Sequence, residues 1–120
     1  MPFVEVIRWV KISSNAEEFR NRIPAQKIYR MSIGKTDLCL TRYDTTIYAF
    51  ENKCPHQVME LTKGTCTDDR KVVCPWHRFA FSLEDGKGAG LYLPVFPVKE
   101  ENNQVFIGFK KVTFKLFGKG

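Results

Sequence analysis

The chain is divided into short runs of β-branched and aromatic residues, and each run ends at a cluster of turn-forming residues. The first run covers residues 3–12 and alternates with a period of two, so one side of a strand would carry Val4, Val6, Arg8, Val10 and Ile12. Further strands are expected at residues 28–33, 38–43, 46–50, 71–73, 79–83, 95–100 and 104–109. Many short strands joined by Gly, Pro and Asn turns predict an all-β fold, an antiparallel β-sandwich or barrel.

The segments between these runs carry turn and capping signals. Turns are expected at residues 34–37, 43–45, 84–88 and 101–103, the last of them closing a hairpin. The polar residues 13–15 predict the cap of one short helical turn over residues 16–20. Residues 52–69 are expected to be irregular, and residues 112–117 to form one more strand or a tail packed on the surface.

The length of 120 residues fits a single domain, 1–120, without an internal linker or repeat. Apolar residues make up 43% of the chain and ten residues are Phe, so a packed core is expected rather than disorder. No apolar run approaches the roughly 18 residues of a membrane span, and the N-terminal residues lack a signal-peptide pattern. We therefore expect a cytoplasmic protein that does not enter a membrane.

The formal charge of +6 is unevenly distributed along the chain. Residues 1–50 have a net charge of +3, residues 51–101 a net charge of −1, and residues 102–120 contain four Lys and no acidic residue. A basic balance invites a nucleic-acid-binding interpretation. The chain has no helix-turn-helix, zinc-finger or aromatic RNA-binding signature, however, so a solvated basic edge is the simpler explanation.

Both His residues and two of the four Cys residues fall in two short motifs. The first is Cys54-Pro55-His56, and the second, after seventeen intervening residues, is Cys74-Pro75-Trp76-His77. Thiolate and imidazole ligands together suit zinc, iron and iron–sulfur centres. A structural zinc site usually pairs two cysteines in one loop, whereas here each loop supplies one sulfur and one nitrogen.

This spacing resembles that of the Rieske [2Fe–2S] family, in which C-x-H is followed by C-x-x-H. Other positions fit the same family, and they spread the similarity over most of the chain: Trp9-Val10, Leu61, Val72-Val73, residues 81–86 and residues 96–98. The resemblance implies a fold similar to Rieske iron–sulfur proteins, with a small cluster-binding subdomain whose loops lie within residues 52–94.

The same resemblance assigns the ligands of one [2Fe–2S] cluster per chain. Cys54 and Cys74 would bind one iron as thiolates, and His56 and His77 would bind the other as neutral imidazoles. Two ferric ions, two sulfides and two thiolates sum to no net charge, whereas an all-Cys cluster would be negative. An electron is therefore accepted more easily than by an all-Cys cluster.

Several positions depart from the high-potential branch of that family, which carries a disulfide between its loops and hydroxyl groups after the second His. Met59 and Trp76 stand where the two disulfide cysteines would be, and Phe79 and Phe81 stand where the hydroxyl residues would be. Fewer hydrogen-bond donors to sulfur predict a low-potential, oxygenase-ferredoxin type of centre. Val58 and Arg78 replace Gly residues that are usual in the family, and Gly there permits left-handed backbone angles.

The remaining sequence features allow structural as well as functional interpretations. Cys39 and Cys66 are expected to be buried free thiols, with a disulfide between them as the alternative. Trp76 is expected either to shield the cluster or to belong to the core. Residues 88–94 look like the family's third loop, which covers the cluster, or else form a connector without contact to it.

Three functions are compatible with this sequence. The first is a one-electron carrier between a reductase and an oxygenase-type terminal enzyme, monomeric when free. The second is the small electron-transfer subunit of an assimilatory nitrite reductase. The third, from another class, is a zinc-stabilised basic binding module. The sequence has no flavin or nicotinamide fingerprint and no mononuclear iron triad, so an electron-transfer component is expected rather than a catalyst.

Overall fold

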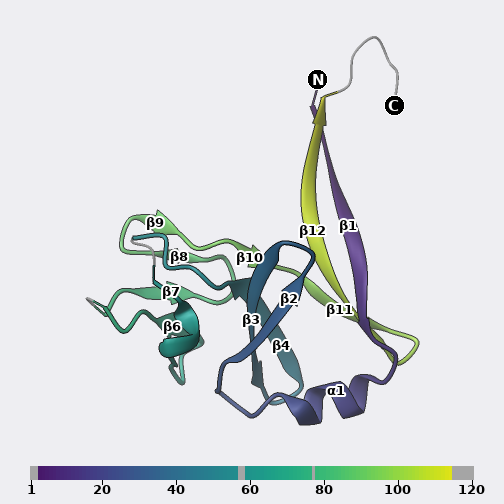
Figure 1. The fold of residues 1–120 in the computed structure, drawn as a ribbon, viewed down its shortest axis with the longest axis horizontal. Coiled ribbons are helices and arrows are strands. Elements are labelled where there is room, and N and C mark those ends of the chain that lie inside the picture. Colours follow the sequence, from purple (N-terminus) through teal and green to yellow (C-terminus); the bar gives the residue numbers. More distant parts are fainter. Residues whose placement is uncertain (1–2, 57–58, 77, 115–120) are drawn as a thin grey trace.

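The computed structural model describes residues 3–56, 59–76 and 78–114, most of which lie in strands (Figure 1). The elements are, in chain order, β1 (Phe3–Ser13), α1 (Ala16–Arg22), β2 (Tyr29–Ile33), β3 (Thr36–Tyr43), β4 (Thr46–Glu51), η1 (Leu61–Lys63), β5 (Thr65–Cys66), β6 (Lys71–Val73), β7 (Ala80–Ser82), β8 (Lys87–Gly88), β9 (Leu91–Tyr92), β10 (Val95–Phe96), β11 (Val98–Glu101) and β12 (Gln104–Phe114). The described strands pair into the sheets β1-β12-β11, β10-β4-β3-β2, β5-β6-β7 and β8-β9. The predicted all-β, antiparallel fold is confirmed.

The sheet β10-β4-β3-β2 separates two hydrophobic cores. Successive residues of a strand point to opposite faces, so β3 can serve both cores at once. The frame core consists of Ala16, Phe19, Ile23, Leu38, Leu40, Ala49, Val105 and Ile107. The loop core consists of Cys39, Tyr43, Phe50, Cys54, Leu61, Val72, Cys74, Phe81, Leu83 and Leu93. Both predicted cysteine ligands therefore belong to one core.

The predicted helical turn is confirmed and is two residues longer than expected. The side chain of Asn15 accepts a hydrogen bond from the backbone N–H of Glu18 (3.1 Å), which caps the helix. Phe19, with 2% of its surface exposed, anchors α1 in the frame core. No helix in the described part of the chain is long and apolar enough to span a membrane.

The expected strand 95–100 is divided, which corrects the prediction. Val95 and Phe96 pair with β4, whereas Val98 begins a strand that pairs with β12. Pro97 lies between them; it has no N–H to donate to a ladder, and its carbonyl accepts from Gly108 (2.8 Å). The proline therefore marks the point where the chain changes sheets.

Other boundaries also differ from the sequence expectations. The segment 52–69, expected to be irregular, contains η1 and β5. The last two residues of each predicted turn, 34–37 and 84–88, belong to the strands β3 and β8. Residues 112–114 continue β12 as one strand opposite β1, while residues 115–117 lie outside the described part of the chain.

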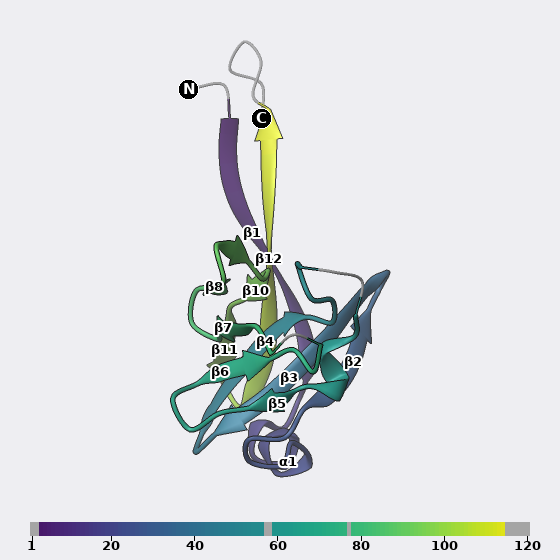
Figure 2. The same ribbon diagram turned by 90° about the vertical axis from the view of Figure 1, so that its left-hand side faces the viewer.

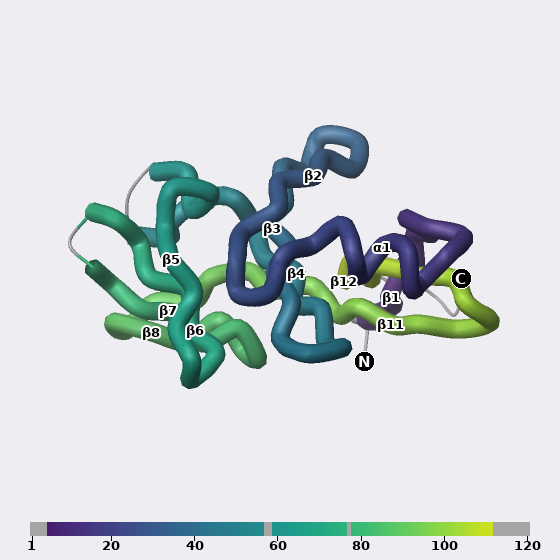
Figure 3. Tube along the Cα trace, turned by 90° about the horizontal axis from the view of Figure 1, so that it is seen from below, coloured from purple at the N-terminus to yellow at the C-terminus, as the bar shows by residue number. Residues whose placement is uncertain are grey.

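The small sheets lie together on one side of the molecule. Figure 1 shows β6, β7, β8 and β9 to the left of the sheet formed by β2, β3 and β4, with α1 below and the long β1–β12 pair to the right. Figure 2 places β5, β6 and β7 towards the viewer, and Figure 3 shows the same division from below. This side, which holds the loop core, is the small subdomain expected from the resemblance.

Candidate metal centre

Two loops with the same backbone closure carry the predicted ligands. The first follows β4, and the backbone N–H of Cys54 donates to the carbonyl of Met59 (2.9 Å). The second follows β6, and the N–H of Cys74 donates to the carbonyl of Phe79 (2.8 Å). Each closure joins a cysteine to the carbonyl five residues later, and each cysteine is followed by a proline with a restricted φ angle. The loops are therefore built alike.

The two cysteine side chains meet in the loop core. Cys54 is 1% exposed and Cys74 is fully buried, and both belong to the same hydrophobic cluster. They lie among apolar residues that exclude water, including Leu61, Val72 and Leu93. Two thiols from distant parts of the sequence are thus brought together in a dry environment.

The surroundings of Cys74 favour its protonated form while no cation is present. Burial raises the pKa of the Cys74 thiol, and the neighbouring Cys54 raises it further, whereas a hydrogen bond from the backbone N–H of Trp76 lowers it. A thiolate at this position needs positive charge beside it, because a metal ligand must be deprotonated. A thiolate at Cys74 is therefore favoured when a metal ion is bound beside it and disfavoured when none is.

His56 links the first loop to the second. Its ring packs edge to face against Phe79, with the ring centroids 4.4 Å apart and the planes at 79°. His56 is exposed, whereas both cysteines are buried. His77, the fourth predicted ligand, lies outside the described residues. The structure therefore places three of the four predicted ligands in the two adjacent loops.

Among residues 3–56, 59–76 and 78–114, no three His, Cys, Asp or Glu side chains form a group that could hold one metal ion. The two buried thiols and the exposed imidazole of His56 lie in adjacent loops and supply sulfur and nitrogen donors. Sulfur and nitrogen donors suit a two-iron cluster in which His ligands replace Cys ligands on one iron.

Arg78 adopts the left-handed conformation that the family's Gly would allow. Its φ angle is 56°, and its side chain is exposed. Left-handed backbone costs a residue with a Cβ about 1 kcal/mol. The replacement of Gly by Arg therefore keeps a left-handed backbone at this position, while Val58 lies outside the described residues.

Trp76 and the third loop answer two questions that the sequence left open. Trp76 is 53% exposed, so the alternative that placed it in the core is wrong. Leu93, from the expected third loop, is 1% exposed and packs in the same core as the two cysteines. The N–H of Leu93 donates to the carbonyl of Gly86. The two residues are so close that any side chain at position 86 would clash, because its Cβ would lie 1.9 Å from the carbonyl oxygen of Leu93. The loop contacts the core and is not a free connector.

Asn52 is a site residue that sequence reasoning missed. It is 6% exposed, two residues before Cys54, and its carbonyl oxygen accepts from the N–H of Thr62 (3.0 Å) and from the thiol of Cys39 (3.2 Å). Its amide nitrogen donates to Asp37 (3.1 Å). These contacts tie both ends of the first loop to β3. A single Asn at the end of a strand gives no sequence signal of such partners.

The Asn52 contacts continue to the protein surface. Arg30 donates two hydrogen bonds to the Asp37 carboxylate, at 3.0 and 2.8 Å. These bonds hold the pKa of Asp37 below its usual value, and the Asp37 carboxylate in turn raises the pKa of Arg30. The network therefore runs from the surface of the β2–β3 hairpin to the base of the first loop.

Cys39 and Cys66 are free thiols, as expected. Burial raises the pKa of the Cys39 thiol to about 12 and raises the pKa of the Cys66 thiol as well. Both therefore remain protonated at neutral pH, and neither belongs to the two ligand loops.

Comparisons with known proteins identify the family of this chain. A family model for the Rieske [2Fe–2S] domain matches residues 9–97. The ferredoxin component of the alkene monooxygenase system of Xanthobacter autotrophicus is 34% identical over 79 residues, which cover 63% of this chain and 65% of that protein. The match thus spans slightly less than two thirds of that relative's length.

Solved structures share the fold. A chain in the complex of reduced oxygenase and oxidized ferredoxin in carbazole 1,9a-dioxygenase has a TM-score of 0.66 at 27% identity, covering 82% of this chain and 91% of that one. A chain described as the putative NADH-dependent nitrite reductase small subunit of Mycobacterium tuberculosis has a TM-score of 0.70 at 18% identity, covering 87% of this chain and 96% of that one. Because the family match includes both ligand loops and most of the chain, this protein belongs to the Rieske [2Fe–2S] domain family.

Proposed function

We propose that Cys54 and Cys74 bind one iron of a single [2Fe–2S] cluster and that His56 and His77 bind the other. The burial of both thiols in one hydrophobic cluster carries this proposal, and the packing of His56 on the second loop supports it. His77 enters through its place in the motif. When bound, such a cluster takes up and releases one electron, and its His ligands raise its potential above that of plant-type ferredoxins.

In this proposal the protein is a one-electron carrier that receives an electron from a reductase and passes it to an oxygenase-type terminal enzyme. The loops meet both demands of a carrier: Cys54 and Cys74 are shielded from water, whereas His56 and Trp76 are exposed where a partner can approach. The ferredoxin component of an alkene monooxygenase system and the oxygenase–ferredoxin complex point to the same role. The carrier acts as a single domain, monomeric when free and located in the cytoplasm.

A second candidate is the small electron-transfer subunit of an assimilatory nitrite reductase. The fold match to the nitrite reductase small subunit, which extends over 87% of this chain, favours it. Both candidates need the same cluster and differ in the electron acceptor. The zinc-stabilised alternative is disfavoured by membership of an iron–sulfur family.

The proposed centre is of the low-potential type. Phe79 packs against His56, and Phe81 is fully buried in the loop core, so neither position offers a hydroxyl group to the cluster sulfurs. Met59 and Trp76 leave no disulfide between the loops. Fewer donors stabilise the more negative, reduced state less well.

The proposal is tested with the full chain purified without oxygen. Two irons and two acid-labile sulfides per chain, a midpoint potential below that of the respiratory Rieske proteins, and electron delivery to an oxygenase are expected. Electron delivery to a nitrite reductase catalytic subunit alone would select the second candidate. A colourless protein with one zinc and no sulfide would overturn both.

A further inference from the structure

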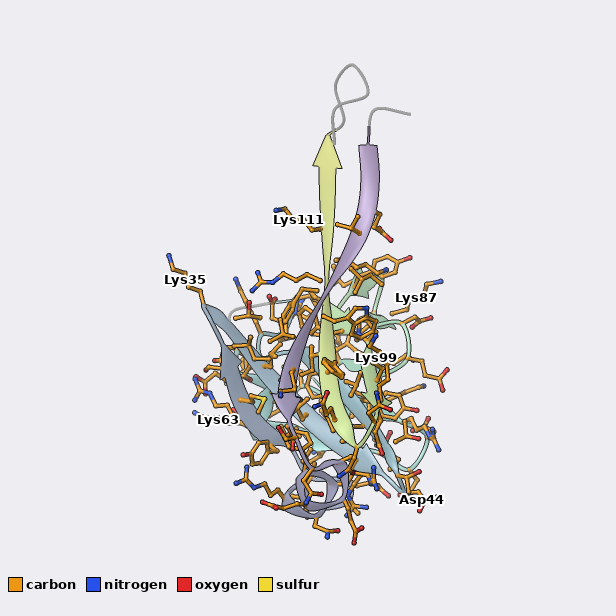
Figure 4. The ribbon with its side chains drawn as sticks, turned by 90° about the vertical axis from the view of Figure 1, so that its right-hand side faces the viewer. Lys35, Asp44, Lys63, Lys87, Lys99 and Lys111 are labelled. Carbon is orange, nitrogen blue, oxygen red and sulfur yellow. The ribbon has the colours of Figure 1, made fainter. Side chains whose placement is uncertain are left out.

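The outer half of the β1–β12 pair has no third strand beside it in the described chain. β11 pairs with β12 only as far as Val98 opposite Ile107, whereas β1 and β12 remain paired from Trp9 opposite Gly108 out to the last described pair. Figures 1 and 4 show this pair extending beyond the rest of the molecule, with Lys111 on it. Residues 3–9 and 108–114 are called the ribbon below.

The ribbon presents backbone edges that can pair with another strand. In the described sheets, β1 has a neighbour on one side only, and β12 has none but β1 beyond Gly108. A two-stranded ribbon is marginally stable by itself in water. Its outward N–H and C=O groups form a template for an added strand. The ribbon is thus suited to accept a polypeptide in extended conformation.

Both faces of the ribbon combine an aliphatic side chain with a lysine. Val6 stands opposite Lys111, and Ile7 stands opposite Lys110, and directly opposed residues point to the same face. Val6 is 43% exposed and Ile7 41% exposed, and both lysines are exposed. A partner strand would therefore meet apolar and cationic groups on either face.

A groove of about 520 Å³ opens between one face of the ribbon and the body of the protein. Ile7 and Lys110 line it from the ribbon, and the body contributes mainly apolar residues, among them Ile47, Leu83, Val95 and Phe96, together with one acidic residue, Glu84. Trp76 and Arg78, at the second ligand loop, are not among its lining residues. A segment docked here leaves the exposed loops free.

The charges of the ribbon indicate which kind of polypeptide would bind to it. The exposed charges of the ribbon are Arg8, Lys110 and Lys111 against the single acidic residue Glu5. A second copy of this chain would bring lysines against lysines, which is unfavourable, whereas acidic side chains complement them. Strand edges favour a protein segment over a nucleic acid, because an added strand satisfies both the N–H and the C=O groups.

The ribbon also lies largely outside the part of the chain that defines the family. The family match covers residues 9–97. It begins at Trp9, the last β1 residue of the ribbon, and it ends before β12 begins. An attachment outside the conserved electron-carrying unit is where recognition of one particular partner can be added without changing the ligand loops.

We propose that the ribbon is a docking arm that binds an acidic, extended segment of the redox partner as an added strand. The acidic segment would pair with a free edge, place its carboxylates near Lys110 and Lys111, and set apolar residues against Val6 or in the groove. That this segment belongs to a redox partner rests on the proposed function; the binding chemistry does not.

The test uses the cluster-containing full chain and a fluorescently labelled peptide of alternating Glu and Val. Saturable binding is expected, and Lys110→Glu with Lys111→Glu should weaken it by roughly tenfold or more, because two charge contacts are reversed. The matched control, Lys27→Glu with Lys35→Glu, changes the net charge equally at exposed positions away from the ribbon and should bind almost as the unchanged chain does.

Four comparisons test the mode of binding and the identity of the occupant. The same peptide N-methylated at every amide keeps its carboxylates but loses its donors, and it should bind at least tenfold more weakly. Equal binding of the methylated peptide, or equal binding of a single-stranded oligonucleotide of the same charge, would overturn the proposal. So would equal loss of binding in both lysine pairs, or concentration-dependent dimerisation through the ribbon in gel filtration.

The outcome is distinguishable from failure of the proposed function. The Lys110→Glu, Lys111→Glu chain should keep its visible spectrum and midpoint potential, because both lysines lie on β12 and outside the two ligand loops. Lost peptide binding with an unchanged cluster supports the docking arm. Unchanged peptide binding in that variant refutes the arm, whatever the cluster proves to be.

Discussion

The two ligand loops close through the same hydrogen bond but are held in place by different forces. The first is fixed by polar contacts, in which Asn52 joins Asp37, Cys39 and Thr62. The second is fixed by the β6–β7 ladder and by Val72 and Phe81, which are fully buried. The first loop thus has a buried amide in addition to the apolar contacts of Leu61, whereas the second depends on its strand ladder and apolar packing.

This difference predicts how each loop fails. Removing a buried hydrogen-bonding side chain leaves its partners unsatisfied, which costs more than the lost bonds themselves. Removing methyl groups from a packed core costs the transfer free energy plus a cavity. A substitution at the base of the first loop should therefore lower the free energy of unfolding more than a substitution of similar size at the base of the second loop.

The largest effect is expected when a ligand is removed, whichever loop supplies it. His77→Ala opens a coordination position on the second iron, so the normal cluster should not assemble, and His56→Ala should behave in the same way. Iron and acid-labile sulfide per chain provide the measurement. A normal His-type paramagnetic signal in the His77→Ala protein would contradict the ligand assignment.

Asn52→Ala should have the next largest effect. It leaves the N–H of Thr62 and a buried thiol without their acceptor, so the free energy of unfolding should fall by about 2 kcal/mol, and the cluster should be lost faster. Denaturant titration and the decay of visible absorbance measure the two effects. Asn21→Ala, at an exposed position in α1, is the control and should change the stability little. Equal stability of the Asn52→Ala and Asn21→Ala proteins would show that the Asn52 hydrogen bonds do not stabilise the first loop.

Val72→Ala tests the apolar support of the second loop. The side chain is fully buried, and loss of two methyl groups with incomplete collapse should cost about 1.5 kcal/mol. Denaturant unfolding measures the change. A loss clearly larger than that of Asn52→Ala would reverse the comparison between the loops.

The sequence predicted the apolar parts of this architecture better than the polar ones. Residues 46–50 and 71–73 are rich in β-branched and aromatic residues, which predicts both strands leading into the ligand loops, and the structure confirms them. The role of Asn52 was not predictable, because its partners come from two other segments, β3 and η1, that only the folded chain brings beside it. The division at Pro97 was also missed, since a proline signals a break in a strand but not a change of sheet.

Arg78→Gly should stabilise the protein slightly. The φ angle of 56° penalises a residue with a Cβ, and glycine relieves this at some cost in unfolded-state entropy, so a gain of about 0.5 kcal/mol is expected. Ala89→Gly provides a matched control at an exposed position with a φ angle of 51° in the turn between β8 and β9. A loss of stability at Arg78 with a gain at Ala89 would show that the Arg78 side chain itself supports the second loop.

The smallest expected effect is an acid sensitivity of the first-loop anchor. Hydrogen bonds from Arg30 hold the pKa of Asp37 below the unfolded value of 3.8, so the stabilisation is present above that pH and is lost as the pH falls through the folded pKa. Asp37→Asn should be less stable at neutral pH and should lose less stability on acidification below about pH 4. Parallel stability curves for the two proteins would contradict this contribution.

Pulsed electron paramagnetic resonance of the reduced full chain tests the central claim most directly, because it counts the nitrogen nuclei coupled to the cluster. Ligation by His56 and His77 predicts two strongly coupled nitrogens, with only one remaining in any residual cluster of the His56→Ala protein. A reduced cluster without coupled histidine nitrogen, or with a single one in the unchanged chain, would contradict the assignment of two cysteines to one iron and two histidines to the other.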